Sequence, residues 1–445
     1  MLVRRNRWKA RCTGQRWRSC LQHGRKEGWR LLLSDETVLE LRERIRQQID
    51  FSGALSDDGL IRLVEKNVFQ WSERNPITAG DKVKLVKRLY HSFRGLDILQ
   101  PLMEDATVTE IMINHHEEIF IERNGKLSKL PMVFESKERL EDLIQTIVAG
   151  VNRAVNESAP IVDARLKDGS RVHVVLPPIA LRGPAVTIRK FPDKPLTVHQ
   201  LVELGTLTEE AAELLCSLIA AQYNLFISGG TGTGKTTFLN ALSQYIPSDE
   251  RIITIEDSAE LQIRTVPNLV SLETRNANTE GKGEITIREL IRASLRMRPS
   301  RIIVGEVRGG EALDMLQAMN TGHSGSMSTG HANGAKDMLA RLETMTLSAA
   351  DMPIPVIRQQ IASALDILVH LSRLRDGSRR VTEICEVLGV VQGEIQLNTL
   401  YRFEEEGERD GRLIGSLQPI GDGLQHTEKL QMAGLYRSMK GSTAS

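Results

Sequence analysis

The stretch SGGTGTGKTT, residues 228–237, constrains most strongly what this chain can fold into. It fits the pattern G-x-x-x-x-G-K-[ST] at Gly229, Gly234, Lys235 and Thr236. The apolar run YNLF precedes it and the helical pattern FLNALSQYI follows it, so the loop is predicted to join a strand to a helix. Glycines let backbone N–H groups turn inward around an anion, and a helix N-terminus adds about half a positive charge. The stretch therefore predicts a phosphate-binding loop.

This loop chemistry gives each residue a role and implies ATP and Mg²⁺ as cofactors. We expect Lys235 to reach the β- and γ-phosphates and Thr236 to ligate Mg²⁺. The alternative is a glycine-rich turn without a ligand, which the flanking strand and helix disfavour. The predicted nucleotide-binding residues of the loop are Gly229, Gly230, Thr231, Gly232, Thr233, Gly234, Lys235, Thr236 and Thr237.

Hydrolysis needs a metal site and a group that orients water, and two strand ends supply acids for them. RIITIEDSAEL places Glu256 and Asp257 at the carboxyl end of one predicted strand, and RIIVGEV places Glu306 at the end of another. Ligands of parallel α/β sheets bind outside these ends. The alternative is that the acids are solvated caps or pair with Arg308. We interpret them as catalytic or metal-supporting groups because the phosphate-binding loop lies on the same predicted sheet.

A third segment, TGHSGSMSTGHANG, is small, polar and rich in turn residues. It carries His323 and His331, and an imidazole can sense a γ-phosphate. A histidine satisfied within a loop is the alternative. No cysteines lie nearby in a zinc-type spacing, so we reject a metal-ligand interpretation.

Patterning along the chain predicts an α/β protein of several domains. Helical periodicity dominates first, mixed strands and helices follow, and strands then alternate regularly with helices, as in a parallel sheet covered on its faces. The predicted segments are a basic, disordered extension at 1–33, a helical bundle at 34–96, an α+β domain at 97–190, a linker at 191–198 and a nucleotide-binding domain at 199–445.

Composition excludes several classes of protein. No run of about 18 apolar residues predicts a membrane span, and the N-terminal segment lacks the apolar core of a secretory signal. The four cysteines form no CxxC pair, which suits a reducing cytoplasm. The net charge is +1 and aromatic residues make up 4% of the chain. A nucleic-acid motor needs a basic groove with aromatic side chains, so we expect no specific nucleic-acid partner.

Taken together, the motifs resemble the type II/type IV secretion ATPases, or traffic ATPases. GGTGTGKTT is similar to their Walker A, ITIEDSAEL to their Asp box, RIIVGEVRG to their Walker B and TGHSGSMSTGHAN to their His box. Upstream, RGLDILQPLMEDATVTEIMIN and PIVDARLKDGSRVHVVLPPIALRGPAVTIRKF resemble the CpaF branch, which serves tight-adherence (Flp) pili. The tetracysteine zinc module of type II export ATPases is absent, which argues against that branch.

The resemblance implies a homohexameric ring at the cytoplasmic face of the inner membrane. Each subunit would hinge an N-terminal domain to a RecA-like ATPase domain, with nucleotide between them. ATP hydrolysis would drive pilin assembly or export through a membrane platform protein, so pilin is reached only indirectly. The alternatives are the ATPase of a DNA or effector type IV secretion channel, and a nucleotide-gated scaffold with little turnover.

The family's functional residues map onto this sequence motif by motif. Glu306 would polarise the attacking water, Glu256 with Asp257 would support the metal and the water, and His331 would contact the γ-phosphate. The resemblance also implies phosphate-contacting arginines from the N-terminal domain, and an arginine finger is worth about 10³–10⁵ in rate. The matching arginines are Arg165, Arg171 and Arg189, with ordinary ion pairs on hairpin edges as the alternative.

Two positions depart from the usual motifs. The Walker B strand ends in Gly305-Glu306 without an aspartate, which leaves Mg²⁺ with fewer protein ligands. Gly330 stands in the His box where a larger apolar residue is common. We expect this glycine to loosen the segment that carries His331.

Overall fold

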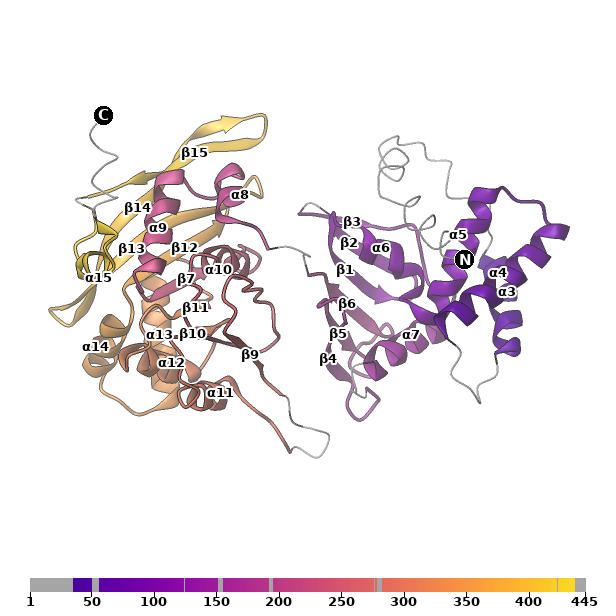
Figure 1. Ribbon diagram of the computed structural model, residues 1–445, viewed down its shortest axis with the longest axis horizontal. Coiled ribbons are helices and arrows are strands. Elements are labelled where there is room, and N and C mark those ends of the chain that lie inside the picture. Colours follow the sequence, from indigo (N-terminus) through magenta and orange to yellow (C-terminus); the bar gives the residue numbers. More distant parts are fainter. Residues whose placement is uncertain are drawn as a thin grey trace. The chain divides into compact units, whose positions relative to one another are not determined.

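The structure is a computed structural model that describes residues 35–49, 56–123, 125–150, 155–191, 195–275, 277, 282–421 and 423–436. The predicted basic extension at 1–33 lies outside these residues. Among the described residues, those before 165 together with 172–188 form one compact unit, and 165–171 together with those from 189 onward form a second. Figure 1 shows the elements of both units. None of the described helices is both long enough and apolar enough to cross a membrane.

Three helices form a bundle at the start of the described chain. They are α3 (Asp35–Gln48), α4 (Asp57–Arg74) and α5 (Ala79–Arg94). The side chain of Ser56 accepts a hydrogen bond from the Gly59 N–H and so caps α4, while Thr78 caps α5 in the same way. Apolar residues at helical spacing meet in one core, namely Val38, Leu41, Ile45, Leu60, Val64, Val68, Leu85 and Leu89. The predicted helical bundle is therefore present.

A six-stranded sheet follows, in the order β3-β2-β1-β6-β5-β4. A short 3₁₀ turn, η1 (Asp97–Leu99), and α6 (Gln100–Glu104) precede it, and α7 (Lys137–Ala149) lies between β3 and β4 in the chain. Side chains alternate between partly exposed and buried along β5, as expected for a sheet with one covered face. The strands are β1 (Val108–His115), β2 (Glu118–Arg123), β3 (Lys126–Lys129), β4 (Ile161–Arg165), β5 (Arg171–Val175) and β6 (Ala185–Arg189).

The second unit is built on a nine-stranded sheet, in the order β15-β14-β13-β12-β7-β11-β10-β8-β9. The strands from β12 to β9 in this order run parallel. Every residue of β7, β8, β10 and β11 is buried, as expected for strands covered on both faces. The parallel strands are β7 (Leu225–Gly229), β8 (Ile252–Glu256), β9 (Leu269–Glu273), β10 (Arg301–Val304), β11 (Met327–Gly330) and β12 (Ile367–Arg373).

Helices cover both faces of this sheet, because successive residues of β7 pack into different cores. Leu225 and Ile227 pack into one core with α9 and α10, whereas Phe226 packs into a second core with α11 to α14. The helices of the unit are α8 (Val198–Glu203), α9 (Glu209–Ala220), α10 (Lys235–Ser243), α11 (Ile287–Ser294), α12 (Glu311–Asn320), α13 (Ala335–Ala349), α14 (Ile354–Ala364) and α15 (Glu428–Met432). The predicted α/β architecture is confirmed.

Antiparallel strands extend the sheet beyond β12. They are β13 (Arg379–Val391), β14 (Glu394–Arg409) and β15 (Arg412–Pro419), and each pairs with its neighbour in the chain. The sequence pattern predicts the strands β12 to β14, but it does not predict β11. The interpretation of TGHSGSMSTGHANG as a turn-rich segment is therefore wrong for 327–330, which form a buried strand between β7 and β10.

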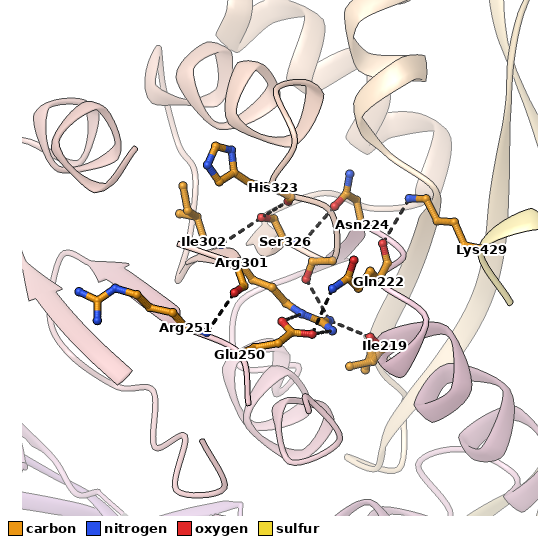
Figure 2. A network of polar contacts seen from close by, with 12 residues as sticks. Ile219, Gln222, Asn224, Glu250, Arg251, Arg301, Ile302, His323, Ser326 and Lys429 are labelled. Carbon is orange, nitrogen blue, oxygen red and sulfur yellow. Dashed lines mark hydrogen bonds and ion pairs between the residues drawn. The ribbon is translucent and has the colours of Figure 1, made fainter. Parts of the chain in front are cut away.

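A buried ion pair ties strand starts together at the amino edge of the parallel strands. Arg301, the first residue of β10, is fully buried, and its Nε and Nη2 atoms lie 2.5 and 2.6 Å from the two carboxylate oxygens of Glu250. Figure 2 shows this pair among its polar neighbours. Arg301 also donates to the carbonyl oxygen of Ile219, and Gln222 donates to Glu250. This network lies at the opposite ends of the strands from the phosphate-binding loop.

Candidate active site

The phosphate-binding loop joins β7 to α10, as predicted. Gly232 and Gly234 have φ angles of 72° and 92°, in the left-handed region that side chains disfavour. Gly234 is also the N-cap of α10 and offers no side chain to the N–H groups of the first turn. An uncapped helix start beside left-handed glycines leaves backbone donors available to an anion. The backbone geometry of the loop thus suits the predicted phosphate binding.

Lys235 is the first residue of α10 and is 8% exposed. Its Nζ donates to the carbonyl oxygens of Gly229 and Gly230 at 3.2 and 3.1 Å, and lies 3.4 Å from Nδ1 of His331. Burial lowers the pKa of the Lys235 ammonium group, while the charge of Glu306 opposes that shift. The ammonium group is thus held at the loop by two neutral carbonyl acceptors.

Glu306 lies between two nitrogen-bearing side chains. Its Oε2 accepts a hydrogen bond from Nη2 of Arg308 at 2.8 Å, and its Oε1 lies 2.7 Å from Nε2 of His331. The Oε1 atom is nevertheless buried without a hydrogen bond from any described residue. The second amino group of Arg308 lies 3.6 Å from a carboxylate oxygen of Asp257. The structure therefore brings Glu306, His331 and Asp257 together. Arg308 links the two acids, and this is the ion pairing that the sequence analysis named as the alternative to a catalytic role.

Glu256 ends β8 and is 4% exposed. Its Oε1 accepts hydrogen bonds from the N–H groups of Glu260 and Leu261 at 2.8 and 3.0 Å. Burial is the largest influence on this carboxyl and raises its pKa to about 7, although the two N–H groups act in the opposite direction. A Cβ atom on Gly305 would lie 2.8 Å from Cγ of Glu256, so the glycine leaves room for the acid.

Thr236 and Asp257 are the other predicted metal-supporting residues. Thr236 is partly exposed in the first turn of α10, directly after Lys235, while Asp257 is exposed and accepts from Thr274 as well as facing Arg308. Among the described residues, no three His, Cys, Asp or Glu side chains are grouped so that they could hold a metal ion by themselves. Hydroxyl and carboxylate oxygens suit Mg²⁺, which keeps several waters and takes substrate phosphates as ligands. This sparse donor set fits a metal that arrives with its nucleotide.

Gly330 does not loosen the segment before His331, contrary to the expectation from sequence. It ends the buried strand β11, and a Cβ atom there would lie 3.0 Å from the ring of Phe226 and 3.1 Å from Cε of Met338. The absent side chain therefore allows close packing. His323 lies elsewhere, since its Nδ1 is 3.1 Å from the carbonyl oxygen of Ala318 near the end of α12.

The three predicted arginines lie at strand ends. Arg165 ends β4, and its Nη1 is 3.8 Å from a carboxylate oxygen of Glu273, with both side chains about 40% exposed. Exposed pairs of this kind are worth about 0–1 kcal/mol. Arg171 begins β5 and Arg189 ends β6. Their roles toward phosphate stay predictions.

An open cavity of about 540 Å³ lies beside Arg308. Of the described residues that line it, none belongs to the phosphate-binding loop. Its walls come from the β10–α12 connection, the residues after β11 and one side of α13, namely Arg308, Gly309, Ala332, Asn333, Asp337, Ala340, Arg341, Thr344, Met345 and Ser348. This cavity is therefore separate from the predicted phosphate-binding loop.

Two residues of the site were not predicted from the sequence. His370 of β12 is buried, with its Nδ1 2.8 Å from Oγ of Ser228, and burial lowers its pKa. Arg379 of β13 donates from Nε to the carbonyl oxygen of Gly232 at 2.8 Å. Both come from segments about 140 residues beyond the loop. The one sequence signal for Arg379 is that a basic residue directly follows the Asp-Gly-Ser turn at 376–378.

The sheet, its connections and the loop define a RecA-like ATPase domain. The chain belongs to the type II/IV secretion system protein family, whose model matches residues 93–407. A putative conjugal transfer protein of Mycobacterium tuberculosis (strain ATCC 25618 / H37Rv) is 35% identical over 330 residues, which cover 73% of this chain and 93% of that protein. Type IV secretion system protein VirB11 of Brucella suis biovar 1 is 31% identical over 342 residues, which cover 70% and 94%.

Solved structures of the same kind match as well. The VirB11 ATPase of the Brucella suis type IV secretion system, crystallised with sulphate, is 30% identical with a TM-score of 0.36 and covers 66% of this chain and 97% of its own. The pilus retraction motor PilT with bound ADP is 18% identical with a TM-score of 0.48 and covers 78% and 89%.

Proposed function

We propose that this chain is an ATP-hydrolysing motor subunit of a type IV pilus or secretion machine. The observation that carries the proposal is the meeting of Lys235, His331 and Glu306 at one edge of the parallel sheet. The Lys235 ammonium lies 3.4 Å from one nitrogen of His331, and the other nitrogen lies 2.7 Å from the Glu306 carboxylate. The groups proposed to bind phosphate, to sense it and to activate water are thus adjacent, in an arrangement that suits phosphoryl transfer.

Nucleotide would bind with its phosphates on the backbone N–H groups of the glycine loop. Lys235 would exchange the carbonyl oxygens of Gly229 and Gly230 for phosphate oxygens, a stronger, charge-assisted interaction. Thr236 would hold Mg²⁺ directly, with Glu256 and Asp257 acting partly through water. When bound, Mg²⁺ neutralises charge on the β- and γ-phosphates.

Glu306 would orient and deprotonate the attacking water. Its Oε1 is buried 2.7 Å from Nε2 of His331, so the ring would position this carboxylate for the attacking water. His331 beside it would contact the γ-phosphate. Arg165, Arg171 and Arg189 would add positive charge against the phosphates, in cis or in trans.

The motor would act as a homohexamer at the inner face of the cell membrane, on a membrane platform protein. Two machines fit this description. Pilus assembly of the tight-adherence kind is favoured by the helical bundle formed by α3 to α5. A DNA or effector secretion channel is favoured by the relatives named as conjugal transfer and VirB11 proteins. Loss of surface pili or loss of plasmid transfer in a deletion strain would distinguish them.

Nucleotide binding and phosphate release by the purified full chain test the proposal. We expect Lys235→Ala to abolish binding of Mg-ATP, because it removes the cation over the phosphates. Glu306→Gln should keep the affinity and lose turnover by about 100-fold or more, as when one catalytic group is removed. Equal turnover of Glu306→Gln and wild type would instead favour a nucleotide-gated scaffold. A wild-type chain that retains no adenine nucleotide would overturn the whole proposal.

A further inference from the structure

Arg379 is the first residue of β13 and follows a well-fixed turn. In that turn, Oδ1 of Asp376 accepts hydrogen bonds from the N–H and Oγ of Ser378 at 2.9 and 2.6 Å. The other carboxylate oxygen accepts from the N–H of Leu413 at 3.0 Å. The hydrogen bond from the Ser378 hydroxyl has the largest effect, and together these bonds lower the pKa of Asp376 to about 2. The backbone that presents Arg379 is therefore held within the turn and tied to β15.

The side chain of Arg379 lies across the tip of the phosphate-binding loop. Its Nε donates to the carbonyl oxygen of Gly232 at 2.8 Å. A Cβ atom on Gly234 would lie 3.5 Å from Cδ of Arg379, so the aliphatic stem rests against this second glycine. The side chain thus contacts both left-handed glycines, Gly232 through Nε and Gly234 through its stem, and a guanidinium group is placed beside the predicted phosphate cradle.

The two amino groups of this guanidinium have no acceptor among the described residues. The side chain is exposed, and its one hydrogen bond in the described part of the chain uses Nε. Neighbouring arginines differ in this respect. Arg375 directs its amino groups to Glu405 at 2.7 and 2.5 Å, and Arg380 donates to the carbonyl oxygen of Gly205. Arg379 alone of these three keeps its planar fork open, and such a fork matches phosphate oxygens.

We propose that Arg379 is a further nucleotide-binding residue, whose amino groups bind the α- and β-phosphate oxygens of a nucleoside di- or triphosphate. This inference rests on the proposed function. The middle of a glycine loop cradles the α- and β-phosphates, and Gly232 lies there. The γ-phosphate would instead face Lys235, His331 and Glu306. Arg379 therefore binds the part that ATP and ADP share, and it supports affinity rather than the chemical step.

Titration calorimetry with ADP and with Mg-ATP, together with steady-state kinetics, tests this assignment on the full chain. Arg379→Ala should weaken both nucleotides alike, by about 10-fold or more, as for the loss of hydrogen bonds to a charged group. KM should rise while kcat stays near wild type, because the contact is equal in ground and transition states. Arg375→Ala is the matched control on the same turn and should leave both affinities within about twofold of wild type by the same measure.

Arg379→Gln separates phosphate binding from support of the loop. Its amide can still donate to Gly232 but offers no charged fork, so we expect it to behave like Arg379→Ala. Wild-type affinity in Arg379→Gln would show that the arginine only props the loop and would overturn the proposal. A loss for ATP with none for ADP would also overturn it, because the contact would then lie at the γ-phosphate. If the proposed function itself fails, wild type and Arg375→Ala will bind no nucleotide either.

Discussion

Nε2 of His331 lies 2.7 Å from Oε1 of Glu306, while Nδ1 of the same ring lies 3.4 Å from Nζ of Lys235. An ammonium group only donates, so Nδ1 must be the acceptor and the ring proton of neutral His331 lies on Nε2, facing the carboxylate. Burial first, and then the charge of Lys235, lower the pKa of His331. The ring is thus neutral at pH 7 and connects the phosphate-binding cation to the proposed base.

This relationship predicts the effect of removing the ring. We expect His331→Ala to lower ATP turnover by about 100-fold, as when one group aimed at the transition state is lost. Nucleotide affinity should change only a few-fold, since the loop backbone and Lys235 remain. His323→Ala is the control from the same segment, because that ring lies near the end of α12. Comparable turnover losses in both variants would contradict a specific role for His331.

Glu256 makes the stability of the nucleotide-free protein depend on pH. Its folded pKa is about 7, raised from 4.5 mainly by burial. Between these values the folded state keeps a proton that the unfolded state has released, so stability falls as pH rises through this window. Below about pH 4.5 the group is neutral in both states, and above about pH 7 the loss is complete. Burying this carboxylate therefore costs the folded protein stability at neutral and alkaline pH.

Glu256→Gln should remove this dependence. Its amide oxygen can still accept hydrogen bonds from the N–H groups of Glu260 and Leu261. The free energy of unfolding of the variant should therefore rise relative to that of wild type by about 3 kcal/mol between pH 4.5 and 7. Urea unfolding of both proteins without nucleotide or Mg²⁺, at pH 5 and pH 8, measures the difference. The exposed Glu284→Gln serves as the control. A stability difference that is the same at both pH values would contradict the shifted pKa.

Gly305 predicts a steric coupling with Glu256. The added methyl group of Gly305→Ala would lie 2.8 Å from Cγ of the buried acid, so the acid must leave the N–H groups that it accepts from. We expect a loss of about 1–3 kcal/mol in unfolding free energy, together with reduced turnover. Gly80→Ala in α5 is the control, because only the Thr78 hydroxyl lies nearby, at 3.7 Å. In a Glu256→Ala background the Gly305→Ala cost should shrink, and an unchanged cost would argue against the coupling.

The ion pair between Glu250 and Arg301 predicts a non-additive effect on stability. Glu250→Ala should destabilise the protein by about 3–5 kcal/mol, because it leaves a fully buried guanidinium without its counter-ion. A double replacement by leucine should cost less than that single change. Urea unfolding of the single and double variants measures both values. A double variant less stable than Glu250→Ala would contradict the idea that the loss comes from leaving the guanidinium shown in Figure 2 unpaired.

The sequence predicts those parts of this protein whose local pattern and chemistry agree. The loop at Lys235 is recognisable because apolar and helical patterns flank it, and the acids Glu256 and Glu306 follow buried runs. The strand β11 escapes prediction because its four residues, MSTG, show neither β-branched enrichment nor alternation; its neighbours β7 and β10 make it a strand. Arg379 could not be predicted for a different reason. It is 147 residues from Gly232 in the chain, and no local pattern indicates which distant residue contacts the loop.

The first glycine of the loop is fixed by the sheet as well as by any ligand. A Cβ atom at Gly229 would collide with the carbonyl oxygen of Leu371 in β12 and lie 2.7 Å from Oγ1 of Thr233. A variant of this chain that no longer bound nucleotide would still need a glycine at position 229 in order to fold. Packing places no such requirement on Lys235. The residue at position 235, rather than the one at position 229, therefore distinguishes a chain that hydrolyses ATP from a related chain that has lost this activity.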